Sequence, residues 1–148
     1  MDEQEFKKQA DAALESLYKK LSAATDSYDF EPDFNAGALS IEFGNPRHQH
    51  ELEALRRHKL PDHMLLLPGV VESNSNIVEH PEVVSRRLEE AVAAVGDRER
   101  VIASADCGFG TFTNREYVIE PVVWLKLKAL RQGADIASTR LWGKRAAY

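Results

Sequence analysis

Four side chains with metal-binding or acid–base groups lie at or directly after the ends of apolar stretches of the chain: Glu42, Glu72, Asp106 and Cys107. The stretches themselves are residues 38–43, 64–71 and 101–105. In parallel α/β sheets, ligands gather at the carboxyl ends of the strands. If these stretches are neighbouring parallel strands, we expect the four side chains to line one edge of a sheet.

Two interpretations of Cys107 stay open. A lone cysteine is most often a small buried apolar residue. Its place at a strand end beside Asp106 instead favours a zinc-binding thiolate or a catalytic nucleophile, which needs a nearby histidine. His48, His50 and His80 are candidates, and no motif selects one of them.

Glu42 and the pair of His48 and His50 also allow two interpretations each. Glu42 stands between apolar neighbours, where a charge is costly unless it is paired or binds a metal; alternation at a sheet edge would instead turn it to solvent. His48 and His50 could bind a metal, although such a pair near a helix start is more often solvated. The polar loop after Glu72 could hold a polar ligand or be an ordinary turn.

The elements that must position these groups alternate between strand and helix. Helices are predicted from Asn45-Pro46 to before Leu60, from Pro81 to Gly96, and over 118–142. Right-handed crossovers would make the three strands a parallel sheet. The almost continuously apolar run 64–71 predicts a central strand that is covered on both faces. The last helix has an apolar stripe at Ile119, Val123, Leu127, Leu130, Ala134, Ala137 and Leu141.

The N-terminal part predicts a helix over 3–24, because apolar residues recur there at helical spacing. The connector 25–37 follows and is rich in turn formers. Its four carboxylates alternate with aromatic residues, which could form a short edge strand with an acidic outer face: Asp26, Asp29, Glu31 and Asp33.

The length, charge and cysteine content of the chain favour some classes of protein and argue against others. The 148 residues suggest one domain, with 43% hydrophobic and 29% charged residues. A net charge of -5 argues against nucleic acid as a partner. No apolar run approaches the ~20 residues of a membrane helix, and the acidic start lacks the features of a secretory signal. One cysteine cannot form an internal disulfide, so we expect a reducing, cytoplasmic setting.

Residues 38 to about 143 resemble the C-terminal end of the cobalamin-independent methionine synthase family. The resemblance rests on four landmarks: Leu39–Phe43, Asn45–Glu51, Pro68–Val71 and Ala105–Gly108. It implies a TIM-barrel catalytic domain whose zinc is held by two cysteines, a histidine and a glutamate. Such a domain moves a methyl group from methyltetrahydrofolate, or a related donor, to homocysteine or another thiol.

By this resemblance Glu42 matches the zinc-binding glutamate and Cys107 the last zinc-binding cysteine. The strand arrangement, not the resemblance, makes Glu72 and Asp106 candidates for a substrate-binding rim. The family's other ligands form a His-x-Cys pattern that this chain lacks. A barrel takes ~250 residues. We therefore expect a partial TIM barrel of three β/α units over 38–148, incomplete and inactive alone, whose open sheet edges invite self-association.

Residues 1 to about 40 instead resemble the start of a bacterial frataxin. The resemblance rests on the apolar positions of 3–24 and on the runs Asp29–Glu31 and Gly37–Leu39. It implies an acidic ridge that binds iron and contacts the iron–sulfur assembly machinery, with Asp26, Asp29, Glu31 and Asp33 among its residues. The sequence thus predicts a frataxin-like segment 1–37 joined to the barrel part. A third interpretation is a chimeric fragment without function.

Overall fold

The computed structural model describes residues 36–110 and 117–143. Its elements, in chain order, are β1 (Ala38–Glu42), the 3-10 turn η1 (Gln49–Glu51), α2 (Leu52–Arg57), β2 (Leu65–Val71), α3 (Pro81–Val95), the 3-10 turn η2 (Arg98–Arg100), β3 (Ser104–Ala105) and α4 (Glu120–Trp142). The predicted helix over 3–24 and the acidic connector lie outside these ranges. Within them, the predicted alternation of strand and helix is confirmed.

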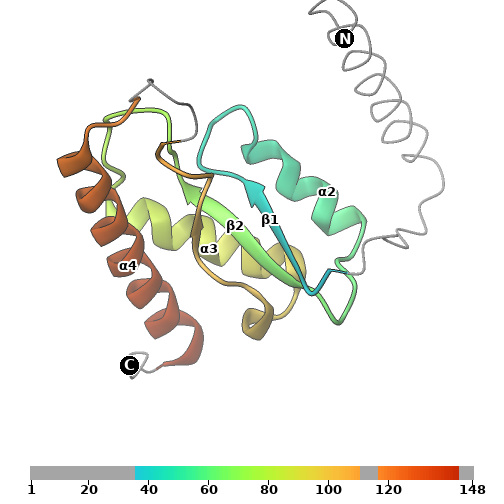
Figure 1. Cartoon of the computed structure of the whole chain (residues 1–148). Helices are drawn as coiled ribbons and strands as arrows, with labels where there is room; N and C mark the ends of the chain where they lie inside the picture. Colours follow the sequence, from blue (N-terminus) through green and yellow to red (C-terminus); the bar gives the residue numbers. More distant parts are fainter. Residues whose placement is uncertain (1–35, 111–116, 144–148) are drawn as a thin grey trace, which may run out of the picture. The chain divides into compact units, whose positions relative to one another are not determined.

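The three strands form one open, parallel sheet in the order β1-β2-β3. Figure 1 shows β1 and β2 side by side. β1 is in register with β2 from the pair Ala38 and Leu65 to the pair Glu42 and Gly69. β3 pairs with the other side of β2. The carboxyl ends of all three strands therefore lie at the same edge of the sheet. This confirms the α/β class and the arc of barrel-like units expected from the sequence.

β2 forms the centre of the core. Leu66, Val70 and Val71 have no solvent exposure, as the apolar run predicted. α3 lies behind β2 with α2 and α4 on either side of it (Figure 1). Leu66 belongs to the apolar cluster under α2 and the C-terminal half of α3, whereas Val70 and Val71 belong to the cluster shared with α4.

The buried face of α4 differs from the predicted stripe. Ile119 and Leu127 are exposed, while the buried positions are Lys126, Ala129, Gly133 and Ala137. The prediction is confirmed for Ala137, which is buried, and for Leu130, Ala134 and Leu141, which pack against the same cluster. It is wrong for Ile119 and Leu127. Gly133 is one of the buried positions, and its missing side chain lets α4 approach α3 closely at that point.

Two predicted boundaries also change. The helix expected from Asn45-Pro46 begins only at Leu52, after turns and η1. The Asn45 side chain accepts a hydrogen bond from the Arg47 N–H at 3.0 Å, which closes a local turn instead of capping a helix. The strand expected over 101–105 is reduced to an isolated bridge at Val101 and the short β3, because the pairing shifts register at the end of β2.

Candidate functional site

The four predicted side chains all follow the carboxyl ends of the strands. Glu42 is the last residue of β1, Glu72 comes directly after β2, and Asp106 and Cys107 come directly after β3. The expectation that they share one edge of the sheet is therefore met. Their environments differ, however, and only some of them are accessible to a ligand.

Asp106 is buried, with 8% of its surface exposed. Its Oδ1 accepts hydrogen bonds from the backbone N–H groups of Phe43 at 3.0 Å and Gly44 at 2.7 Å. Its Oδ2 accepts from the N–H of Asn45 at 3.0 Å. This carboxylate therefore ties the end of β3 to the segment that follows β1. Its oxygens face the protein backbone, which makes Asp106 a structural residue of the edge.

The environment of Asp106 shifts its acidity in two opposing ways. Burial raises the pKa of Asp106 above the ordinary aspartate value. The N–H groups of Gly44 and Phe43 act against this, because they stabilise the charged form. The negative charge of Glu42 raises the pKa further. The net direction is upward, so burial outweighs the backbone hydrogen bonds.

Two glycines make room for this carboxylate. A Cβ on Gly44 would meet Asp106 Oδ2 at 2.9 Å and the Glu72 nitrogen at 2.7 Å. A Cβ on Gly69 would meet Asp106 Oδ1 at 2.6 Å. Sequence reasoning missed both positions, although Gly69 lies inside an apolar strand, where a glycine is a known sign of close backbone approach.

Cys107 is half-buried, and its sulfur lies 2.8 Å from the Ser73 hydroxyl. Either atom can be the donor in this pair. Ser73 itself is 1% exposed and follows β2. The thiol is thus neither a fully buried apolar group nor fully open to solvent. It is directed toward the end of the central strand.

Glu42 and His48 form a second group at the same edge. The Glu42 side chain is 43% exposed, and its Oε2 lies 3.7 Å from Nε2 of His48. His48 Nδ1 lies 2.6 Å from the Glu51 carboxylate. The hydrogen bond with Glu51 raises the pKa of His48, and the charges of Glu51 and Glu42 act in the same direction. His50 is exposed to solvent.

The loop after β2 is fixed by a network that the sequence did not suggest. The Glu72 N–H donates to Oε1 of Glu79 at 2.8 Å, and the Glu72 carboxylate accepts from Ser75 at 2.9 Å. Oε2 of Glu79 lies 3.0 Å from Nζ of the fully buried Lys126. One signal was available, since Lys126 is three residues after Val123 in the predicted stripe of α4.

A metal site is not assembled by these residues. Within 36–110 and 117–143, no group of three His, Cys, Asp or Glu side chains could hold a metal ion. β1 and β3 lie on opposite sides of β2, and at their carboxyl ends the Asp106 carboxylate lies between the backbone after β1 and the end of β3. The predicted iron residues lie outside the described ranges: Asp26, Asp29, Glu31 and Asp33.

Comparison with known proteins finds a likeness of fold. No family model matches the chain, and no curated protein matches its sequence. The structure is similar to that of a B12-independent methionine synthase from Shewanella sp. W3-18-1 in complex with selenomethionine, with a TM-score of 0.57 and 24% sequence identity. The match covers 74% of this chain and 29% of that protein. In the described segments, no helix has the length and apolarity needed to cross a membrane.

Proposed function

We propose that this chain supplies the C-terminal strand–helix units of a zinc-dependent methyltransferase barrel of the cobalamin-independent methionine synthase type. The observation that carries the proposal is the position of Glu42 and Cys107 after two strands of one parallel sheet, at the same edge. The likeness to a B12-independent methionine synthase supports it at the level of the fold. In this role both side chains would be zinc ligands.

The described residues fall short of a complete site. A catalytic zinc usually has three protein ligands and one open position, and no such group is present in the parts of the chain that the structure describes. His48 is a candidate for the third zinc ligand, because its Nε2 lies 3.7 Å from the Glu42 carboxylate. Its Nδ1, however, already lies 2.6 Å from the Glu51 carboxylate. We therefore propose that methyl transfer to homocysteine or another thiol requires further protein, and that the chain by itself is inactive.

Asp106 has a positioning role in this proposal. The residue after Glu42 donates its N–H to Asp106 Oδ1, and Asp106 is the residue before Cys107. One carboxylate thus links the backbones of the two proposed ligands. This buried link limits how far the backbones beside Glu42 and Cys107 can move apart before a metal binds.

Calorimetric titration of zinc into the full chain tests the proposal. We expect weak binding that is reduced in Cys107→Ser and in Glu42→Gln. Glu53→Gln, which removes an exposed carboxylate from α2, is the matched control and should bind like the wild type. Equal affinity in all four proteins would show that these residues do not bind zinc. Formation of methionine from methyltetrahydrofolate and homocysteine by the chain alone would contradict its proposed incompleteness.

The iron-binding alternative from the N-terminal resemblance remains a prediction. A parallel titration with ferrous iron tests it. Binding that is lost in Asp29→Asn and kept in Cys107→Ser would favour the alternative. If neither zinc nor iron binds, the third interpretation, a fragment without function, is favoured.

A further inference from the structure

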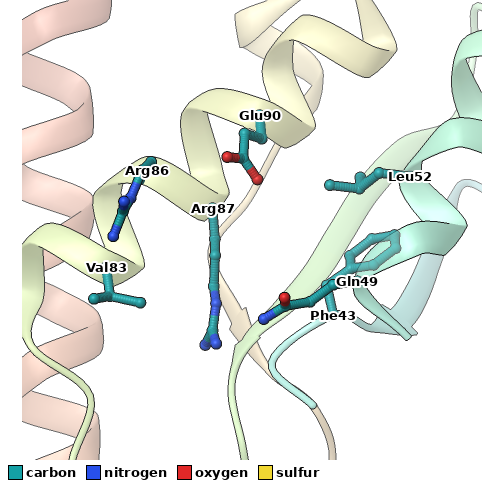
Figure 2. Close-up of a pocket in the computed structure, with 7 residues that line it drawn as sticks. All are labelled: Phe43, Gln49, Leu52, Val83, Arg86, Arg87 and Glu90. Atoms are coloured by element: carbon teal, nitrogen blue, oxygen red, sulfur yellow. The ribbon is translucent and has the colours of Figure 1, made fainter. Parts of the chain in front are cut away.

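A pocket of about 290 Å³ lies between η1, the start of α2 and the outer face of α3 (Figure 2). Phe43 and Leu52 supply its apolar wall. Gln49 lies on one side of it, and Arg86 and Arg87 of α3 lie on the other. Neither zinc nor the proposed methyl transfer gives this pocket a role.

Arg87 is held in place by the sheet. Its Nη1 donates a hydrogen bond to the Val70 carbonyl at 2.8 Å. Val70 lies where the pairing of β2 with β3 shifts register, between Gly69 and Val71. A guanidinium has five N–H donors, so this bond orients the group and leaves other donors for a ligand. Such preorganisation lowers the entropic cost of binding.

The polar groups around the pocket favour an anion. Arg86 has no hydrogen-bond or ion-pair partner in the described part of the chain. The Gln49 amide points toward the Arg87 guanidinium from the opposite side (Figure 2). Glu90 is the one carboxylate in the lining, so the lining carries two positive charges and one negative charge. This local balance is opposite to the net charge of -5 of the whole chain.

We propose that this pocket binds a small organic carboxylate with an apolar body. The planar guanidinium matches the geometry of a carboxylate, which can accept two parallel hydrogen bonds from it. Phe43 and Leu52 then contact the apolar body of the ligand. Ligand pockets usually measure about 300 to 1,000 Å³, so a pocket of about 290 Å³ is at the small end of this range and suits a ligand of about one ring.

Phenylacetate and its uncharged analogue phenylacetamide are the probes that test the proposal. Each is titrated into the full chain while the side-chain amide resonances of Gln49 are followed by NMR. We expect saturable shifts with phenylacetate at millimolar concentration. Phenylacetamide should bind at least about fivefold more weakly, because a hydrogen bond to a charged group contributes more than one between neutral groups.

Two variants show whether phenylacetate binding depends on this pocket or only on the net charge of the protein. Arg86→Gln removes an exposed cation that has no partner in the described residues, and it should weaken phenylacetate binding at least about fivefold. Lys128→Gln removes an exposed cation from α4 and should leave binding unchanged. The proposal is overturned if the Gln49 signals do not saturate, if both probes bind equally, or if both variants lose affinity equally.

Discussion

Asp106 lies directly over Gly69, so that a Cβ on Gly69 would collide with the Cα of Asp106 and lie 2.6 Å from its Oδ1. Gly69 belongs to the central strand, and the Asp106 side chain passes it to reach the backbone after β1. The absence of a side chain at one position of β2 is therefore what allows β3 and β1 to be linked across β2.

Gly69→Ala should destabilise the fold by about 3 kcal/mol or more, because the new methyl group would meet backbone atoms that cannot rotate away. The backbone nitrogen of Asp106, at 2.8 Å from the added Cβ, is one of them. Urea-induced unfolding followed by circular dichroism measures the change. Gly37→Ala is the control, since a Cβ there has nothing within 4 Å, and its effect should be within about 0.5 kcal/mol. Equal stability of the two variants would show that the edge adapts freely.

Asp106→Asn should cost about 1 to 3 kcal/mol at neutral pH. The asparagine oxygen can still accept from Phe43 and Gly44, whereas its NH2 group would face the N–H of Asn45 and leave it unsatisfied. Chemical denaturation at pH 7 measures the loss. Asp62→Asn, at an exposed carboxylate, is the matched control and should change stability little.

The pH dependence of stability provides a separate test of Asp106. Because burial raises its pKa in the folded state, the folded protein keeps this proton over a pH range in which the unfolded chain has lost it. The contribution of Asp106 to stability therefore falls as pH rises from the ordinary aspartate value through the raised one. Asp106→Asn should lack this component. If wild-type stability instead rises relative to the variant in that range, the backbone hydrogen bonds outweigh burial.

The sequence was sufficient to predict the parallel sheet, because strand and helix periodicities alternate in order and the run 64–71 is apolar throughout. It also predicted that Glu42 and Cys107 share one edge, which follows from strand direction alone. It could not assign Asp106 its structural role. That role depends on N–H groups more than sixty positions earlier in the chain, which only the tertiary fold brings near.

Lys126 shows a second limit of sequence reasoning. A lysine on an amphipathic helix is expected in solvent, yet its side chain is fully buried. It is satisfied by Glu79 and by the Ile77 carbonyl, both from the loop after β2. The predicted stripe of the helix did not include Lys126, although the residue lies three positions after Val123. Its partners lie 47 and 49 residues away, so no local pattern reveals them.

Lys126→Met should destabilise the protein by about 3 to 5 kcal/mol, because it leaves the carboxylate of Glu79 buried without its cation. Adding Glu79→Gln should recover part of the loss, since glutamine is neutral and can still accept from the Glu72 N–H. Urea unfolding of both variants measures the recovery. Lys128→Met, at an exposed position of the same helix, should change stability by less than about 0.5 kcal/mol. A double variant that is less stable than Lys126→Met would contradict this view of the pair.

Gly133→Ala should destabilise the contact between α3 and α4, although alanine favours an isolated helix by about 1 kcal/mol over glycine. The added methyl group would collide with the Val84 side chain and lie 2.9 Å from the Pro81 carbonyl oxygen. Because Val84 is fully buried, it has no open space to move into. The steric cost should therefore exceed the gain in helix propensity, and chemical denaturation measures the balance.

Val84→Ala provides the second arm of a double-mutant cycle with Gly133→Ala. Each single change should destabilise the protein, the first by leaving a cavity and the second by overpacking. Together they should be less damaging than the sum of the single losses, because Val84→Ala removes Cγ1, one of the two Val84 atoms that lie 2.4 Å from the added Cβ. Additive losses would show that the Cβ of residue 84 and the Pro81 carbonyl, which both remain, set the closest approach of the two helices.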